Sequence, residues 1–161
     1  MTALKTSVSG MSRVIQGKVI MVAQDVLDQL WPKVVPLLMK EKKWWEAYYD
    51  IEDILAHIKS GNLQLWIGVE KSEIFLACLT EIAVFPKCRI LRYVFLAGRG
   101  IKPLRPSVIE INQWGAMHGC TRSEIFGRDA WIYLMAPFGY KKKSVIIEHI
   151  FDMHLGSNRS N

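Results

Sequence analysis

The feature that most constrains the fold is the stretch from Leu63 to Ala97, in which apolar residues follow a strand-like period instead of a helical one. The stretch contains three strand-like runs, and no more than three residues separate each run from the next. The runs cover residues 65–70, 73–85 and 89–97, and the connections are Lys71-Ser72 and Pro86-Lys87. Connections this short join antiparallel neighbours, because a parallel crossover needs a dozen or more residues. The stretch therefore predicts a three-stranded antiparallel meander.

The second of these runs is apolar on both of its alternating faces. Phe75, Ala77, Leu79 and Ala83 fall on one face, and Ile74, Leu76, Cys78 and Ile82 fall on the other. A strand that is buried on one side only shows an alternation of apolar and polar residues, whereas one that is covered on both sides does not. We expect this run in the middle of a sheet with other elements packed on both faces.

A short strand at 19–22 and two helices are expected before the meander. Asp25 suits an N-cap, and apolar residues follow it at helical spacing as far as Leu38. Pro32 and Pro36 each remove a backbone donor inside that span, so we expect a kink, a break or two short pieces. The second helix covers 50–60 and ends at Gly61, a residue suited to the position after a helix.

After the meander the pattern alternates between helix and strand. We expect a helix that starts near Pro103 or Ser107 and ends at His118, a strand at 123–127, a helix at 128–137 and a closing strand at 144–151. The helix between the last strand of the meander and the strand at 123–127 implies a parallel crossover. The prediction is an α+β fold, with a mixed, mostly antiparallel sheet, a parallel central pair and helices on both faces.

Length and composition are those of one globular domain. The chain has 161 residues, of which 50% are hydrophobic and 22% are charged. We expect a flexible segment at 1–18, a single domain at 19–154 and a flexible tail at 155–161. No run approaches the roughly 18 apolar residues of a membrane span, which favours a soluble protein that is not secreted. The three cysteines show no paired spacing, so neither a disulfide framework nor a metal site is indicated.

The net charge of +6 favours anionic partners without selecting among them. Lysines cluster at 40–43 and at 141–143, where a solvated face is the simpler interpretation and a binding patch the alternative. Nucleic acid is therefore kept as a minor partner hypothesis. The aromatic residues Trp44, Trp45, Tyr48 and Tyr49 are interpreted first as packing and second as a pocket wall.

The order of elements resembles that of the GNAT acetyltransferase superfamily, and two local segments carry the likeness. WGAMHG at 114–119 is similar to the family's helix that ends in Ala and then Gly, and RDAWIYLMAPFGY at 128–140 is similar to its penultimate helix with the following Gly-aromatic pair. LQLWIGVE at 63–70 and RYVFLAG at 92–98 further resemble the GNAT-like proteins of tailed bacteriophages. The resemblance spans about residues 19–151.

In that family the acyl-CoA diphosphate is bound by backbone amides of a glycine-rich turn at a helix N-terminus. The resemblance places the cofactor-binding residues at Leu96, Ala97, Gly98, Arg99, Gly100 and Lys102. Arg99 matches the family pattern of Arg or Gln, two residues, Gly, one residue and Gly or Ala. Lys102 and Leu104 stand where small residues are expected, and Pro103 removes an amide, so the turn is altered.

Two residues are candidates for the chemistry. In many members a tyrosine protonates the leaving thiolate, and it stands four residues before the Gly-aromatic pair. That position here is Met135, and the nearest tyrosine, Tyr133, lies two residues earlier. Glu81 is a candidate general base, because burial makes a carboxylate a better proton acceptor. A structural role for Glu81, at the end of the buried stretch or in an ion pair with Arg92, is the alternative.

Because the loop and the tyrosine are both altered while the fold pattern is kept, the sequence favours a GNAT-fold binding or assembly protein without catalysis. The phage resemblance implies a virion or accessory protein in the host cytoplasm or the virion, with phage structural proteins as partners. The first alternative is an active N-acyltransferase that uses acetyl-CoA or another acyl-CoA. The second is a nucleic-acid-binding domain.

Overall fold

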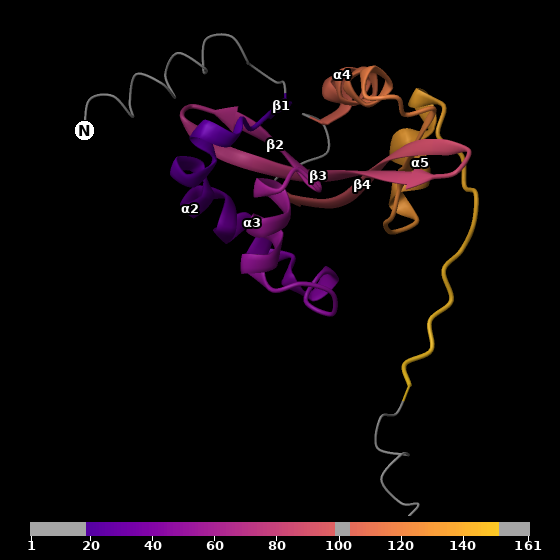
Figure 1. The fold of residues 1–161 in the computed structure, drawn as a ribbon, viewed down its shortest axis with the longest axis horizontal. Coiled ribbons are helices and arrows are strands. Elements are labelled where there is room, and N and C mark those ends of the chain that lie inside the picture. Colours follow the sequence, from indigo (N-terminus) through magenta and orange to yellow (C-terminus); the bar gives the residue numbers. More distant parts are fainter. Residues whose placement is uncertain (1–18, 99–103, 152–161) are drawn as a thin grey trace, which may run out of the picture.

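The sheet is the centre of the molecule. The computed structural model describes residues 19–98 and 104–151, apart from the side chains of 104–106. It contains a five-stranded mixed sheet in the order β1-β2-β3-β4-β5. The strands are β1 (Val19–Met21), β2 (Leu63–Glu70), β3 (Glu73–Phe85), β4 (Cys88–Gly98) and β5 (Arg122–Ile125). The mixed α/β fold with helices on both faces of the sheet is as predicted (Figure 1).

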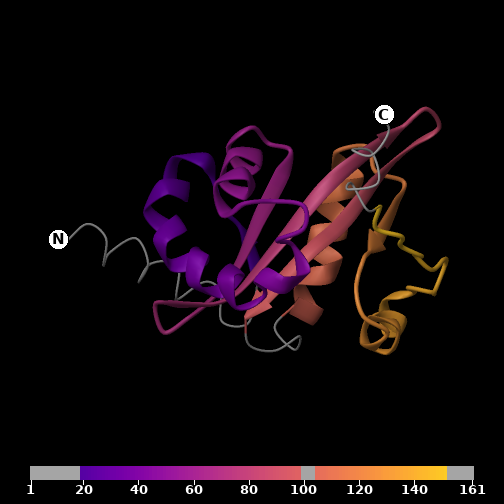
Figure 2. The same cartoon turned by 90° about the horizontal axis from the view of Figure 1, so that it is seen from below.

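The predicted meander is confirmed. β2, β3 and β4 pair antiparallel in sequence, and β3 lies in the middle of the sheet. Lys71 and Ser72 both have positive φ, at 49° and 66°, as the two central residues of a tight hairpin turn do. At its far end the β3–β4 hairpin projects beyond the helices (Figure 2).

Helices α2 (Gln24–Lys40) and α3 (Ile51–Lys59) cover one face of the sheet, and the short 3-10 helix η1 (Lys42–Trp44) follows α2. The predicted helix at 50–60 is confirmed, with Asp50 as N-cap and its amide donating to the Asp53 carboxylate at 2.8 Å. The N-cap of α2 is Ala23, so the prediction of Asp25 in that role was wrong; Asp25 lies in the first turn.

The two prolines do not break α2. The helix runs through Pro32 and Pro36 as one element, so the predicted break or division into two pieces was wrong. Both rings are exposed, and residues four apart lie on the same side of a helix. Because that side faces water, solvent can bond to the carbonyls that lose an amide partner. The opposite side carries Leu27, Val34 and Leu38 into the core.

Helix α4 (Leu104–Met117) covers the other face, as Figure 1 shows. It forms the crossover between β4 and β5, which pair parallel as predicted. The amide of Val19 donates to the buried Ser107 hydroxyl at 2.7 Å, which ties β1 to this helix. Helix α5 (Ala130–Met135) and the 3-10 helix η2 (Ala136–Phe138) follow β5 and pack against the same core. No helix in the described ranges is long and apolar enough to cross a membrane.

The closing strand predicted at 144–151 was wrong. Residues 141–151 have no helix or strand, and the chain runs away from the body in Figure 1. Five apolar side chains in it are at least 66% exposed, namely Val145, Ile146, Ile147, Ile150 and Phe151. Alternating β-branched residues give the strand pattern, but a strand also needs a neighbour to pair with, and this segment pairs with none of the described strands. β5 is consequently the edge strand, so the parallel pair lies at the sheet edge and not at its centre.

The aromatic cluster between α2 and α3 is divided between core and surface. Trp45 is buried, and its indole N–H donates to the Leu38 carbonyl at 3.0 Å. Trp44 and Tyr48 are 47% and 71% exposed. Tyr49 is half-buried and packs edge-to-face on Phe95 of β4, with the ring centres 6.1 Å apart. Packing therefore accounts for Trp45, whereas Tyr49 both packs on the sheet and lines the smaller of the two cavities described below.

Candidate functional site

The parallel strands β4 and β5 run together for only four residues. Ile90 to Tyr93 pair with Arg122 to Ile125, and the last bond, from the Phe126 amide to the Tyr93 carbonyl, is 3.5 Å long. Beyond Tyr93, β4 continues to Gly98 and stays paired with β3 alone among the described strands. The backbone of β4 from Val94 to Gly98 therefore has a free edge on the side of β5, directly before the predicted cofactor loop.

The residues predicted to bind acyl-CoA fall into two groups. Arg99, Gly100 and Lys102 lie outside the described residues. Leu96 packs with the core on the α4 side, and Ala97 is buried in the core on the α2 side. Gly98 is exposed and has φ +115°. These assignments stay predictions, since none of the three lines either of the two cavities described below.

A row of alternating charges crosses the sheet on the α2 side. Arg92 of β4 lies opposite Glu81 of β3 and opposite Glu124 of β5 in the strand registers. The Arg92 guanidinium is 3.5 Å from the Glu81 carboxylate and 3.2 Å from that of Glu124. The Lys143 ammonium extends the row, 3.1 Å from Glu124. The predicted pairing of Glu81 with Arg92 is thus confirmed.

Aromatic rings enclose the centre of this row. The Arg92 guanidinium lies 5.4 Å from the ring centre of Phe85 and 5.2 Å from that of Phe126. Burial by itself would raise the pKa of Glu124, but the hydrogen bonds from Lys143 and Arg92 outweigh it and hold the pKa below its usual value. Glu124 is therefore an ionised carboxylate at neutral pH, fixed by two cations.

Glu81 also borders a small cavity of 420 Å³. Its wall includes Tyr49 and His57 from the α3 side, Gln64 of β2 and Arg89 of β4. The Tyr49 ring lies edge-to-face on His57 with the ring centres 5.6 Å apart. Burial, and to a lesser extent the charge of Glu81, raise the pKa of Tyr49, so its hydroxyl stays protonated. The cavity thus offers a carboxylate, a phenol and an imidazole to a polar ligand.

Tyr133 does not join this group. It lies on α5 with 79% of its surface exposed, and it lines neither cavity. Met135, at the position where the family resemblance expects the acid, is buried in the core on the α4 side. The structure therefore does not bring Glu81 and Tyr133 to one cavity, and a catalytic role for either stays a prediction.

A partly buried polar network beside β5 was not predicted. The Tyr93 hydroxyl donates to Asn112 Oδ1 of α4 at 3.0 Å, and the Asn112 amide donates to the Tyr140 hydroxyl at 3.0 Å. The Tyr140 hydroxyl also meets Ser123 of β5. Burial raises the pKa of Tyr93 well above its usual range, so it acts as a donor. The signal in the sequence was a polar residue, Asn112, between the apolar residues Ile111 and Trp114 of α4.

The larger cavity lies on the outer side of β5, and its volume is 690 Å³. One wall is formed by β5 and the turn after it, a second by α5 and η2, and a third by residues 141–146. Its lining includes Trp131, Met135 and Phe138 together with Arg122 and Glu124. Among the described residues, no group of three His, Cys, Asp or Glu side chains could hold a metal ion.

Three solved structures show the same fold at low sequence identity. An aminoglycoside acetyltransferase from an uncultured soil metagenomic sample, in complex with sisomicin, has a TM-score of 0.61 and 12% identity over 84% of this chain and 96% of its own. A predicted acetyltransferase with acetyl-CoA from Clostridium acetobutylicum has a TM-score of 0.61 and 12% identity, with 83% and 95% covered.

Glucosamine-6-phosphate N-acetyltransferase from Arabidopsis thaliana has a TM-score of 0.60 and 12% identity, with 84% and 98% covered. No family model matches the sequence, and no curated protein matches it either. The likeness is one of fold, and the chain has the GNAT fold that the order of its elements predicted.

Proposed function

We propose that this GNAT-fold chain is a binding or assembly protein that does not transfer acyl groups. The observation that carries the proposal is the side chain at the position of the family's acid. Met135 occupies it and is buried in the core, and a thioether has no proton to donate to a leaving thiolate. The nearest phenol on the same helix, Tyr133, faces solvent.

The state of Glu81 supports the same conclusion. A general base needs a carboxylate that is free to accept a proton from the acceptor amine. The Glu81 carboxylate is instead engaged with Arg92 at 3.5 Å, and Arg92 is itself held by Glu124 and two phenyl rings. Each charged group in the row already has a partner of opposite charge within the protein, as in a structural ion-pair network.

A binding role is supported by exposed apolar side chains of the kind that partners cover. Monomeric proteins rarely expose large contiguous apolar patches. Here such side chains gather in the segment after Lys143, and Trp44 and Tyr48 add a second exposed group. In keeping with the sequence resemblance, we propose a phage virion or accessory protein, in the host cytoplasm or the virion, with phage structural proteins as partners.

The alternative is an active acyl-CoA-dependent N-acyltransferase. It is favoured by the structural neighbours, which include a predicted acetyltransferase determined with acetyl-CoA. The free edge of β4 before Gly98 would then take the pantetheine arm of an acyl-CoA, and Glu81 would act as base from the smaller cavity. This function requires Arg92 to release Glu81 when substrate binds.

Calorimetry with acetyl-CoA and desulfo-CoA, combined with transfer assays on a panel of amines, distinguishes a binding protein from an active N-acyltransferase. We expect no turnover with any amine. Turnover that is lost in Glu81→Gln and kept in Glu46→Gln, a surface carboxylate paired with Lys42 at 3.7 Å, would establish the enzyme and end the proposal.

Nucleic-acid binding remains the third hypothesis on the strength of the net charge of +6. Two of the clustered lysines are already paired, Lys42 with Glu46 and Lys143 with Glu124. Contacts to phosphates release counterions, so binding to short DNA or RNA must weaken steeply with salt. The absence of any mobility shift at low salt would exclude this function.

A further inference from the structure

Charge is divided unevenly between the two halves of the chain. Residues 19–85 contain six Lys and Arg against ten Asp and Glu, whereas residues 86–151 contain eleven against four. The net charge of +6 therefore combines an acidic half with a strongly basic one. Such an asymmetry favours contact with an anionic partner through the basic half.

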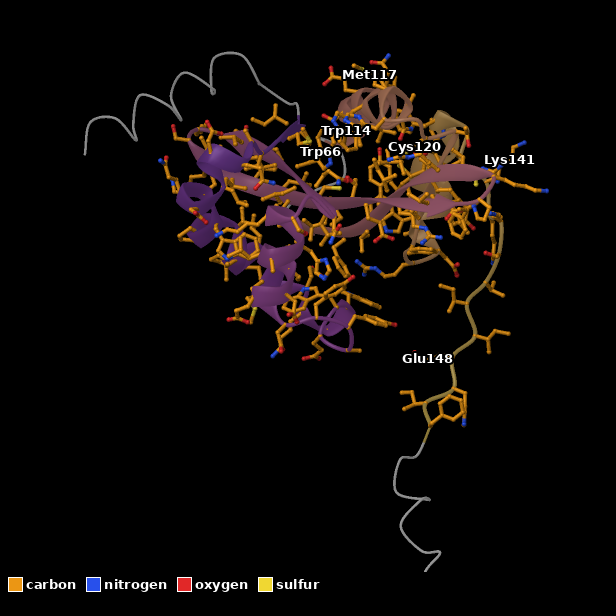
Figure 3. The ribbon with its side chains drawn as sticks, viewed as in Figure 1. Trp66, Trp114, Met117, Cys120, Lys141 and Glu148 are labelled. Atoms are coloured by element: carbon orange, nitrogen blue, oxygen red, sulfur yellow. The ribbon has the colours of Figure 1, made fainter. Side chains whose placement is uncertain are left out.

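The fold gathers free cations of the basic half along β5 and the turn after it, and this surface is called the basic strip from here on. Its members are Arg122, Arg128, Lys141 and Lys142. Each is exposed, and none forms an ion pair with another of the described residues. The Tyr140 hydroxyl contacts Ser123, and Lys143 contacts Glu124. These two contacts hold the lysines beside β5, and in Figure 3 Lys141 lies at the end of the molecule away from α2.

Carboxylates near the basic strip do not cancel its charge. The row of alternating charges formed with Glu81 and Glu124 has its own two cations, Arg92 and Lys143, so it is balanced in itself. The exposed Asp129 leaves the strip an excess of three positive charges. In Figure 3, Glu148 lies far from the folded body. The strip is therefore a positive surface that attracts anions.

Two exposed aromatic rings border the strip. Phe126, directly after β5, is 46% exposed, and Phe85, at the end of β3, is 44% exposed. Both rings lie against the Arg92 guanidinium, on the α2 side of the sheet. Arg122 and Glu124 are two residues apart on β5, so Arg122 lies on that side as well. Cations and flat apolar surfaces thus share one side of the sheet.

This combination selects among anionic partners. Single-stranded nucleic acid offers phosphates to Lys and Arg, and its unpaired bases stack on aromatic rings. An acidic protein segment offers negative charge without flat rings. A duplex offers phosphates, but its bases are stacked on one another. The strip and its two rings therefore fit a single strand best.

The basic strip is separate from the loop predicted to bind acyl-CoA. Arg122 lies opposite Ile90 of β4, eight residues before Gly98 at the other end of that strand. At about 3.3 Å per residue, about 26 Å separates the level of Arg122 from the start of the loop. Arg122 is therefore too far from the loop to contact a diphosphate bound there.

We propose that the basic strip binds single-stranded nucleic acid, with phosphates on its four cations and bases on Phe126 and Phe85. Such binding goes beyond the proposed function and does not depend on whether the chain transfers acyl groups. Every base has a flat face and every nucleotide a phosphate, so the binding is independent of sequence.

Fluorescence anisotropy with the full chain tests the proposal. The labelled probes are an oligothymidylate of about 20 nucleotides, its duplex with oligoadenylate, and a peptide of glutamates. We expect the single strand to bind most tightly. Each phosphate contact to a single strand contributes about −0.7 to the slope of log affinity against log salt, so four contacts give about −3. No binding at low salt, or tighter binding of the duplex or the peptide, would refute the proposal.

A pair of charge variants tests the location. Lys141→Gln combined with Lys142→Gln removes two cations of the strip, and we expect an affinity at least about tenfold weaker at low salt and a slope shallower by about 1.4. The matched control combines Lys33→Gln with Lys71→Gln, which removes the same charge from exposed positions in the acidic half. An equal loss in the control would show an effect of net charge alone and would overturn the assignment to the strip.

Phe126 tests the stacking separately from the charge. Phe126→Leu keeps an apolar side chain beside Arg92 but removes the ring, so the affinity for the single strand should fall about 5- to 100-fold while the salt slope stays the same. Phe126→Trp restores a ring and should bind like the parent protein. Unchanged affinity in Phe126→Leu would show that no base stacks there. An equal loss in Phe126→Trp would show that the ring acts through the fold, and either result contradicts the proposed contact.

Discussion

At the scale of single residues, Arg92 joins two carboxylates and two aromatic rings. It pairs with Glu81 and Glu124, and its guanidinium lies between the rings of Phe85 and Phe126. Its side chain is 22% exposed and that of Glu124 is 17% exposed, so water screens this interaction only in part. We therefore expect the charge row to contribute more to stability than a fully exposed ion pair does.

We predict that Arg92→Met lowers the free energy of unfolding by about 1–3 kcal/mol, because it leaves Glu124 with a single cation in a half-buried site. Lys59→Met is the control, since the pair of Lys59 with Asp28 joins side chains that are 49% and 75% exposed. Exposed pairs of this kind contribute about 0–1 kcal/mol. Urea unfolding of both variants provides the comparison. Equal losses of free energy of unfolding would show that the charge row stabilises the fold no more than an exposed ion pair.

The same residues predict a loss of stability in acid. The pKa of Glu124 is lowered in the folded protein, so its contribution is present above the usual glutamate pKa of about 4.3 and is lost as the pH falls through the lower folded-state value. Glu124→Gln removes this dependence. As the pH is lowered from about 6 to about 3, the free energy of unfolding should therefore fall less steeply in the variant than in the parent protein. Parallel curves would contradict the prediction.

Gly98 is the glycine that the sheet requires. A Cβ at this position would lie 2.1 Å from the Phe75 carbonyl oxygen and 2.8 Å from the Leu76 Cα, and φ is +115°. Gly98→Ala must therefore push β4 from β3, and we expect a loss of more than about 3 kcal/mol.

Gly61→Ala isolates the backbone contribution to that loss. Its φ is +80°, but no atom lies within 4 Å of the added Cβ, so the strain alone costs about 1–2 kcal/mol. Thermal unfolding of the two variants gives the difference. Similar midpoints would mean that the strands move apart without cost.

At the scale of elements, helix α2 tolerates two prolines because they share its solvent side. Each still removes an amide donor and costs up to about 3 kcal/mol relative to alanine in a helix interior. Part of that cost is offset, because proline also restricts the unfolded chain by about 1 kcal/mol. We predict that Pro36→Ala raises the free energy of unfolding by about 1–2 kcal/mol, whereas Lys33→Ala, at another exposed position of α2, changes it by less than about 0.5 kcal/mol.

Local connections explain which elements could be predicted from the sequence. The two-residue turn that pairs Phe85 with Cys88 fixes the register of β3 and β4, so the pairing of Glu81 with Arg92 follows from counting along the strands. The pairing of Arg92 with Glu124 could not be counted in this way, because β4 and β5 are joined through a whole helix. No short turn sets their register.

The strand expected at 144–151 failed for the opposite reason. Its alternation and β-branched residues are local properties, and they say nothing of which edge the strand joins or whether that edge belongs to the same chain. The site was only partly predictable for a related reason. Glu81 was found because a carboxylate interrupts an apolar strand. The cavity around it could not be found in this way, because Tyr49, His57 and Gln64 come from a loop, a helix and another strand, and no local pattern shows that these meet beside Glu81.

At the scale of the whole molecule, two hydrophobic cores lie on opposite faces of one sheet. Leu65, Ala77 and Leu79 belong to the core under α2 and α3, while Trp66 and Cys78 belong to the core under α4. In Figure 3, Trp66 and Trp114 lie together between the sheet and α4, and their ring centres are 5.6 Å apart. Because β3 contributes alternate residues to both cores, we expect the two to unfold as one cooperative unit.

The thiol of Cys78 can report that cooperativity. It is fully buried in the central strand, and burial raises its pKa to about 12. Since the thiolate is the reactive form, Cys78 should react with an aromatic disulfide reagent only when the sheet opens. In the Cys88→Ser, Cys120→Ser background, the free energy of opening from the labelling rate should equal the free energy of global unfolding by urea. Faster labelling would show that one core opens while the other stays folded, and the sheet would then be two units instead of one.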